Sequence, residues 1–422
     1  MGVKTSKIKS IKAREILDSR GNPTIEAELI TDIGVFVSSV PSGASVGKNE
    51  AIELRDGGER YRGKGVLKAV SNVNKVIGPK LKGKNVLGQN SIDATLIEID
   101  GTKDKSRLGA NAILAVSMVC CRAGAAANRL PLYKYIRKIS GIKTKTYILP
   151  SPSFNIINGG AHAGSDLDFQ EFMINPQTKT FSGSFQMAAE IYQELKILIQ
   201  QKYSKVAANL GDEGGFAPPI SIPESAIGLI IKAAEKIGYE NKIKIILDVA
   251  ASQFFTGNGY KTNFRFFSRE DFAEYYLELV KRYPIVAIED PFAEDDWQGW
   301  QTFHSNLLSQ NSDLVIIGDD LLATNPAKIK EAQEKDACNG VIIKLNQIGT
   351  VTEAIEAAKL AKSFGWKIMV SHRSGETNDD FIADFAVGIE ADYIKAGAPA
   401  RGERVAKYNR LLKIEEELNS RK

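Results

Sequence analysis

The chain contains 422 residues, of which 43% are hydrophobic and 25% are charged, and its formal net charge is +4. A chain of this length and composition can form a large domain and a smaller one, each with its own core. The small net charge and the lack of a dense block of Lys and Arg in the sequence exclude nucleic acid as the expected partner, whereas an anionic small molecule remains compatible with it.

Cysteine usage and hydropathy indicate the cellular compartment. The cysteines, Cys120, Cys121 and Cys338, are odd in number and form no CxxC pair, which argues against a disulfide framework and a zinc site. The basic N-terminus is not followed by the apolar segment of a secretory signal. The longest apolar run, residues 112–121, is well below the roughly 18 residues that span a bilayer, so it predicts a buried helix. We therefore expect a cytoplasmic protein without stable membrane association.

The first part of the chain predicts an α+β domain. Residues 9–15, 24–30 and 35–40 are β-rich runs, and the pattern becomes helical from about residue 65. The segment 143–152 contains Pro150 and Pro152, which interrupt regular structure. We therefore place a boundary here, between an N-terminal α+β capping domain of residues 1–142 and a C-terminal domain of residues 143–422.

The second part alternates short apolar runs with long amphipathic helices such as 182–200 and 223–237. Six runs, preceded by candidate strands near Phe154 and Phe172, make eight strands, which is the number in a closed β/α barrel. The six runs are residues 243–247, 285–288, 314–317, 341–343, 368–370 and 393–394. The fold class is therefore α/β, and catalysis is expected at the C-terminal ends of the barrel strands.

Three acidic residues predict a metal site. Asp248, Glu289 and Asp319 close three successive apolar runs, so on a barrel their carboxylates converge at the mouth. Their mutual repulsion requires a cation, and an all-oxygen set favours Mg²⁺, with Mn²⁺ as a substitute, over Zn²⁺. The alternative is that each acid caps the helix that follows its strand. Recurrence in consecutive β/α units favours metal binding.

Two lysines are candidate bases or anion clamps. Lys344 and Lys395 end two further runs, although a lysine at a strand end can also simply extend its ammonium group to solvent. To act as a base, a lysine must lose about 3.4 units from its reference pKa, or ~4.6 kcal/mol. Positive charge from a metal, from Arg373 and from the other lysine is expected to supply part of that shift.

Acid catalysis requires a different set of residues. Glu213 lies in a Gly-rich turn and Glu171 precedes a candidate strand. If the two carboxylates meet, repulsion raises the pKa of one and makes it a proton donor; alone, each would be a solvated surface glutamate. His162 and His372 lie in segments rich in Gly or Ser, where a catalytic and a structural role are equally open, whereas His304 is expected to be structural.

Eight motifs between about residues 13 and 418 resemble those of the enolase family. They are Ser19-Arg-Gly-Asn-Pro23, Pro41-Ser-Gly-Ala-Ser45, Leu108-Gly-Ala-Asn-Ala112, Gln170-Glu-Phe172, Gly211-Asp-Glu-Gly-Gly215, Ile288-Glu-Asp-Pro-Phe292, Lys344-Leu-Asn-Gln-Ile-Gly349 and Ser371-His-Arg-Ser-Gly-Glu-Thr377. The resemblance implies a barrel with modified first β/α units and a magnesium-dependent lyase. That lyase would interconvert 2-phosphoglycerate and phosphoenolpyruvate in glycolysis and gluconeogenesis.

The resemblance also implies a role for each site residue. Two Mg²⁺ would bind per active site, the first to Asp248, Glu289 and Asp319 and the second to Ser45. A Lys or His base that works with magnesium is a known feature of this superfamily rather than a result of the spacing. The remaining roles are base at C2 for Lys344, acid at the C3 hydroxyl for Glu213 with Glu171 and His162 beside it, phosphate binding for Arg373 and Ser374, and substrate contact for Lys395 and His372.

The resemblance also bears on assembly. It implies a homodimer or a homo-octamer, and the sequence does not choose between them. Val46 stands where the family usually has Thr, and Lys48-Asn49 also varies, which bears on loop closure rather than on chemistry. A catalytically silent enolase-like binding protein and another lyase or racemase of the superfamily are the alternatives. The full set of expected catalytic residues disfavours the first, and the motifs disfavour the second.

Overall fold

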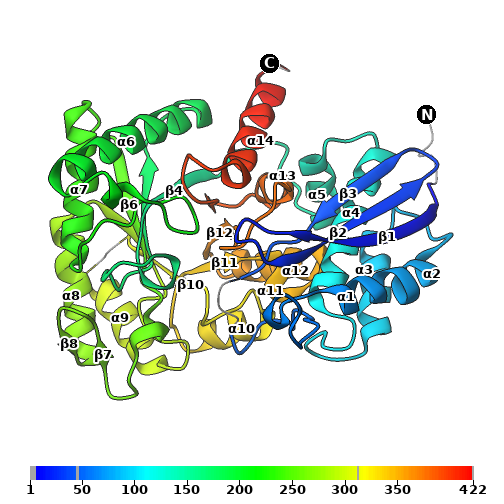
Figure 1. Ribbon diagram of the computed structural model, residues 1–422, viewed down its shortest axis with the longest axis horizontal. Coiled ribbons are helices and arrows are strands. Elements are labelled where there is room, and N and C mark those ends of the chain that lie inside the picture. The colour runs from blue at the N-terminus through cyan, green and yellow to red at the C-terminus, as the bar shows by residue number, and fades with distance from the viewer. Residues whose placement is uncertain (1–5, 44–46, 311–312, 421–422) are drawn as a thin grey trace.

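The computed structural model describes residues 6–43, 47–310 and 313–420 (Figure 1). Ser45 and Val46 lie outside the described residues. In Figure 1 the N-terminal part, drawn in blue and cyan, lies beside the larger barrel, drawn from green to red.

The N-terminal part begins with an antiparallel sheet of strands β1 (Ile8–Leu17), β2 (Pro23–Thr31) and β3 (Val35–Ser39) in that order. These strands confirm the three predicted β-rich runs. Alternate residues of β2, namely Ile25, Ala27 and Leu29, are fully buried, and β2 and β3 contact helix α4. One face of the sheet therefore packs on a helical layer.

That helical layer is centred on α4 (Ala110–Ala127). Helix α4 could span a membrane by its length and composition alone, yet 89% of the helix is buried inside the protein. The predicted buried helix is therefore confirmed as a core element. Around it lie α1 (Leu67–Asn72), a π-helical turn (Val73–Ile77), α2 (Gly78–Leu81), α3 (Gln89–Asp100) and α5 (Leu132–Ser140), after a short turn at Arg60–Gly63.

The C-terminal part contains the predicted closed barrel of eight strands, in the spatial order β10-β11-β12-β13-β4-β5-β6-β9. The strands are β4 (Ser151–Asn158), β5 (Glu171–Pro176), β6 (Ile243–Asp248), β9 (Ile285–Glu289), β10 (Val315–Gly318), β11 (Gly340–Ile343), β12 (Lys367–Ser371) and β13 (Tyr393–Lys395). β5 pairs antiparallel with β4 and with β6, whereas the other barrel pairs are parallel. The segment 159–170 that joins β4 to β5 contains only the short helical turn Gly160–His162, too little for the crossover that parallel strands need.

Helices cover the outside of the barrel. Hydroxyl and carboxyl caps start several of them: Thr180 accepts a hydrogen bond from Gly183 N, and Ser268 accepts one from Asp271 N. The helices are α6 (Phe181–Lys202), α7 (Pro223–Lys236), α8 (Arg269–Arg282), α9 (Trp297–Ser309), α10 (Pro326–Glu334), α11 (Leu345–Ile348), α12 (Val351–Ser363), α13 (Phe381–Gly388) and α14 (Gly402–Asn419). Short turns at Val206–Ala208 and Ala251–Phe254 and a hairpin of β7 (Tyr260–Lys261) and β8 (Phe266–Phe267) complete the fold.

The hydrophobic core has two parts. A large cluster fills the space between the strands, the helices and the N-terminal part. A separate small cluster takes alternate residues from the barrel strands, which places it inside the barrel. Its buried members are Met173, Ile246, Ala287, Val315, Ile317, Ile342 and Met369.

The N-terminal part joins the barrel tightly where α5 packs on α13. The buried Arg137 guanidinium donates to the carbonyl oxygens of Gly388 (2.8 Å) and Val387 (2.9 Å), which end α13. A Cβ on Gly388 would lie 2.5 Å from Cγ2 of Ile136, so the two helices meet without room for a methyl group. The domain boundary at residue 142 stays a prediction, although α5 ends at Ser140 and β4 begins at Ser151.

We predict that Gly388→Ala lowers the free energy of unfolding by about 1–3 kcal/mol, because the added methyl overpacks the contact between α5 and α13. The matched control is Gly228→Ala in α7, where an added Cβ meets nothing within 4 Å. The free energy of unfolding of that variant should rise by up to about 1 kcal/mol, because Ala has a higher helix propensity than Gly. Urea denaturation of both proteins measures the difference, and equal stabilities would contradict the close packing.

Candidate active site

The polar side chains at the strand ends point to the same side of each strand as the apolar side chains that fill the barrel. Side chains alternate along a strand, so residues two apart point the same way. Each of the following pairs joins an inward-facing residue to a polar residue two positions away: Met173 and Glu171, Ile246 and Asp248, Ala287 and Glu289, Ile317 and Asp319, Ile342 and Lys344, and Met369 and Ser371. Tyr393, which packs against the same interior cluster, is related in this way to Lys395. The sequence therefore directs these side chains to the mouth of the barrel.

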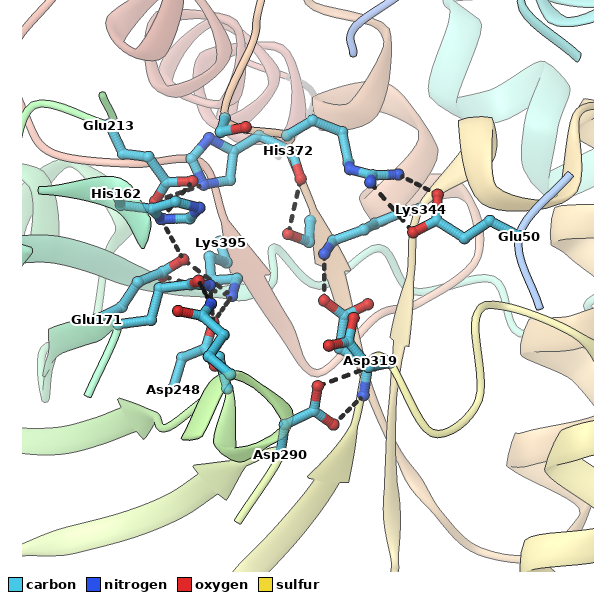
Figure 2. Close-up of a pocket in the computed structure, with 17 residues that line it drawn as sticks. Glu50, His162, Glu171, Glu213, Asp248, Asp290, Asp319, Lys344, His372 and Lys395 are labelled. Carbon is cyan, nitrogen blue, oxygen red and sulfur yellow. Dashed lines mark hydrogen bonds and ion pairs between the residues drawn. The ribbon is translucent and has the colours of Figure 1, made fainter. Parts of the chain in front are cut away.

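A buried pocket at this mouth collects the predicted site residues (Figure 2). It is lined by His162, Glu171, Glu213, Asp248, Asp319, Lys344, His372, Arg373, Ser374 and Lys395, all of which the sequence had singled out. Glu289 is fully buried behind Lys395 and does not line the wall. Ser45 lies outside the described residues, so its placement stays a prediction.

Lys395 is the centre of one charged group. Its Nζ donates to both carboxylate oxygens of Glu289 at 2.8 Å, to Asp248 Oδ2 at 3.2 Å and to Glu171 Oε1 at 3.4 Å. Burial alone would lower the pKa of Lys395, but the carboxylates of Glu171, Glu289 and Asp248 raise it well above its usual value. This lysine is therefore held as an ammonium ion.

Lys344 and Asp319 form a second group. Lys344 Nζ donates to Asp319 Oδ2, and Gln347 Nε2 donates to Asp319 Oδ1 at 2.9 Å. Burial acts to lower the pKa of Lys344, but the carboxylates of Asp319 and Glu289 act against it, and the net shift of the pKa is upward. Arg373 and Lys395 lower the pKa of Lys344, as expected, but each has a smaller effect on this pKa than Asp319 has.

The three proposed metal ligands are divided between these two groups. Asp248 and Glu289 contact Lys395, whereas Asp319 contacts Lys344. Among the described residues, none of the three caps a helix through its side chain, so the alternative interpretation is not borne out for the helices seen here. Three buried carboxylates without His or Cys are of the donor type that fits a hard divalent cation. In the described residues, the acidic group whose ligand atoms lie within 4.8 Å of one another around Asp319 is Asp290, Asp319 and Asp320. The residues present therefore fit Mg²⁺, and the identity of the ion stays a proposal.

Asp290 shapes the turn that carries Asp319, and the sequence reasoning did not assign it a role. Its two carboxylate oxygens accept hydrogen bonds from the backbone N–H groups of Asp319 and Asp320, both at 2.8 Å. Its own backbone has a φ of 43°, which is unusual for a residue with a side chain. The run Glu289-Asp290 marks an acidic strand end, but the sequence does not show which carboxylate faces the pocket.

Glu171 and Glu213 lie close together, with ligand atoms within 4.8 Å of each other, so the condition under which one pKa was expected to rise is met. His162 Nδ1 lies between them, 3.6 Å from Glu171 Oε1 and 3.5 Å from Glu213 Oε1. Burial and the charge of Glu213 raise the pKa of Glu171 well above its usual value. Burial would also raise the pKa of Glu213, but His372 and His162 together lower this pKa well below its usual value. The two pKa values are therefore shifted in opposite directions, upward for Glu171 and downward for Glu213, whereas the family resemblance implied Glu213 as the acid.

Glu213 has two further partners on its other oxygen. His372 Nε2 lies 3.4 Å from Glu213 Oε2, and Asn155 Nδ2 donates to the same oxygen at 2.9 Å. Burial lowers the pKa of His372 to about 4, so this ring is neutral at pH 7. Asn155 was missed by the sequence reasoning because nothing distinguishes it from other asparagines within a predicted strand.

The residues expected to bind phosphate lie at the other end of the pocket. Arg373 donates from Nη1 to Glu50 Oε2 at 2.9 Å and from Nη2 to Glu50 Oε1 at 3.2 Å. Ser374 Oγ accepts a hydrogen bond from Arg20 Nη1 at 2.9 Å. Figure 2 shows Glu213 and His162 on the opposite side of the pocket from Lys344 and Glu50. Arg20 and Glu50 were not predicted, since they reach the barrel from the N-terminal part.

The geometry agrees with comparisons to known proteins. The chain matches the enolase N-terminal domain over residues 8–136 and the enolase C-terminal TIM barrel domain over residues 146–422. It is 53% identical to Enolase 1 of Entamoeba histolytica over 428 residues, which cover 98% of this chain and 97% of that relative. It is 50% identical to the enolase of Eimeria tenella over 432 residues (98% and 96%) and 52% identical to that of Mastigamoeba balamuthi over 429 residues (98% and 97%).

We predict that His372 makes the free energy of unfolding depend on pH. Because its pKa is about 4 in the folded chain, against a reference of about 6.5, only the unfolded chain takes up the proton between these values. Its stabilising contribution is therefore complete above pH 6.5 and falls by about 3 kcal/mol as the pH approaches 4. Denaturation of the wild type and of His372→Gln between pH 4.5 and 7 isolates this contribution. Identical pH profiles for the two proteins would contradict it.

Proposed function

This chain belongs to the enolase family, and on that premise we propose that Lys344 and Glu213 carry out the two proton transfers of the enolase reaction. The enzyme is a lyase of glycolysis, a phosphopyruvate hydratase. In the forward direction 2-phosphoglycerate loses a proton from C2 and the hydroxyl group from C3, giving phosphoenolpyruvate and water. The observation that carries the assignment is that Lys344 and Glu213 lie on opposite sides of one buried pocket (Figure 2).

Lys344 is the proposed base at C2. Only the neutral amine can accept a proton, and Asp319 stabilises the ammonium form through a direct hydrogen bond. Lys344 can therefore act as a base only when the charge of Asp319 is engaged elsewhere. Arg373 and Lys395 then remain as nearby positive charges, and both lower the pKa of Lys344.

We propose that Asp319 binds a metal ion, which occupies its charge in place of Lys344. Asp248, Glu289 and Asp319 would hold the first Mg²⁺, and Ser45 would hold a second together with the substrate phosphate; Mn²⁺ can substitute. When bound, these ions act as Lewis acids on the substrate carboxylate and stabilise the charge that develops after C2 deprotonation. Asp290 supports this role because it fixes the backbone of Asp319.

Glu213 is the proposed acid at the C3 hydroxyl. The pKa of Glu171 is raised and the pKa of Glu213 is lowered, so a proton must reach Glu213 before the hydroxyl can leave as water. His162 Nδ1, which lies 3.5–3.6 Å from both carboxylates, is placed to pass it. The three residues would thus work as one acid group, with Glu213 as its terminal donor.

The remaining residues would bind the substrate. Arg373 and Ser374 would contact the phosphate group, since a guanidinium matches phosphate geometry and Arg373 pairs with Glu50, which lies across the pocket from Glu213. Lys395 and His372 would contact the substrate between the two ends. We also infer that the enzyme is cytoplasmic and works as a homodimer or homo-octamer, without nucleic acid or stable membrane association.

We predict that the reaction requires Mg²⁺ and that Asp319→Ala or Glu289→Ala abolishes it, because each variant removes a ligand and leaves the other carboxylates uncompensated. Calorimetric titration with Mg²⁺ should show lost or weakened binding in both variants, while circular dichroism checks the fold. Full turnover in excess EDTA would overturn the metal assignment.

We predict that the two proton-transfer variants fail differently. Lys344→Ala should abolish exchange of the C2 hydrogen of 2-phosphoglycerate with deuterated water, because no base remains. Glu213→Gln keeps the base and should retain exchange, whereas phosphoenolpyruvate formation should fall about 10²- to 10⁴-fold, as is typical when a general acid is lost. Deuterium incorporation by NMR and product absorbance measure the two steps. Exchange that survives in Lys344→Ala but not in Glu213→Gln would show that the roles are reversed.

A further inference from the structure

Arg404, on helix α14, makes a direct contact with the ring of His372. Its side chain is fully buried, and its Nη1 lies 2.7 Å from His372 Nδ1. A guanidinium is always protonated and can only donate hydrogen bonds. His372 Nδ1 must therefore accept, which in a neutral ring places the hydrogen on Nε2.

The guanidinium is held in place from several directions. Nη1 also donates to the carbonyl oxygen of Arg373 at 2.6 Å. Nη2 donates to the carbonyl oxygens of Ser374 at 2.6 Å and Asp212 at 3.1 Å. These carbonyls belong to the segments on either side of the pocket that carry His372 and Glu213. The guanidinium cannot turn away from His372 without leaving buried carbonyls unpaired, at about 1–3 kcal/mol each.

Nε2 of His372 is buried without a formed hydrogen bond to any described residue, and the acceptor beside it is Glu213. The distance from His372 Nε2 to Glu213 Oε2 is 3.4 Å, and Figure 2 shows the imidazole ring beside this carboxylate. Glu213 Oε1 is then left for His162 and the pocket. The contacts thus form a directed series from Arg404 through His372 to Glu213.

We propose that Arg404 is a positioning residue for acid catalysis: it fixes His372 as the Nε2–H tautomer, which donates to Glu213 and orients its free oxygen toward the substrate. The orientation of Glu213 toward the substrate rests on the proposed function of Glu213 as the acid, whereas the tautomer of His372 does not. The low pKa of His372, set first by burial and also by the Arg404 charge, agrees with a neutral ring. No family motif in the sequence pointed to this arginine, because its partners are carbonyls and a histidine far away in the chain.

The protein contains its own reference for the tautomer. The sequence has three histidines, and His304 Nδ1 lies 2.8 Å from the carbonyl oxygen of Asp336. A carbonyl only accepts, so the His304 ring must carry a hydrogen on Nδ1. His304 should therefore show a protonated Nδ1 and His372 an unprotonated Nδ1 in one spectrum.

The first experiment is a long-range ¹H–¹⁵N correlation spectrum of the full enzyme labelled with ¹⁵N-histidine at pH 7, without substrate. The variants His162→Gln and His304→Gln assign the signals by removing one ring each. We expect His372 to show a protonated Nε2 and an unprotonated Nδ1, and His304 to show a protonated Nδ1. A protonated Nδ1 on His372 overturns the proposal, whatever the role of Glu213.

The second experiment removes the donor. Arg404→Met should leave His372 as a mixture of tautomers and lower phosphoenolpyruvate formation at least tenfold more than C2 exchange. The matched control is Lys407→Met, which removes another buried cation from α14, one that contacts Glu376 and Thr377 rather than His372. The control should keep the His372 tautomer and change both rates by a similar factor.

The outcomes separate the two hypotheses. An Arg404→Met protein that keeps a pure Nε2–H tautomer contradicts control of His372 by Arg404. Loss of the tautomer with equal losses of exchange and product formation contradicts Glu213 as the acid, while the control of His372 stands. If Arg404→Met does not fold, the wild-type spectrum still decides the tautomer.

Discussion

The constraint on which the site depends is the burial of several carboxylates around two ammonium groups. Asp248, Glu289 and Glu171 share Lys395, and Asp319 is paired with Lys344. Removing an ion from water costs several kcal/mol, so each carboxylate needs a compensating cation at close range. Lys395 is held as an ammonium ion by these carboxylates, and Lys344 is paired with Asp319. The proposed metal site and the proposed lysine base both depend on this charge arrangement.

The barrel supplies that arrangement through the alternation of its strands. An apolar residue inside the barrel and a charged residue two positions later share one face, as Ile246 and Asp248 do. Closure of the sheet then brings together side chains that lie far apart in the chain, such as Glu171 and Lys395. The antiparallel strand β5 places Glu171 at its N-terminal end, opposite Asp248 in register, so this acid reaches the same mouth from the other direction.

Much of this could be predicted from the sequence. The eight strands, the buried helix α4 and the charged residues at the strand ends follow from hydrophobic runs that stop at a charge, a pattern that is local. The division of the three acids between two lysines does not follow from that pattern. What could not be predicted depends on distant contacts and on backbone angles. Asp290 has a φ of 43° and holds the backbone of Asp319, the pKa of Glu171 is raised by burial and by Glu213, and two histidines lower the pKa of Glu213. No run of residues encodes these facts.

The two ends of the pocket are supported by opposite ends of the chain. Glu50 and Arg20, from the N-terminal part, contact Arg373 and Ser374, so the phosphate end depends on how that part packs on the barrel. Arg404, from the final helix, orients the acid end through His372. His372, Arg373 and Ser374 are consecutive, so the same short segment receives both supports.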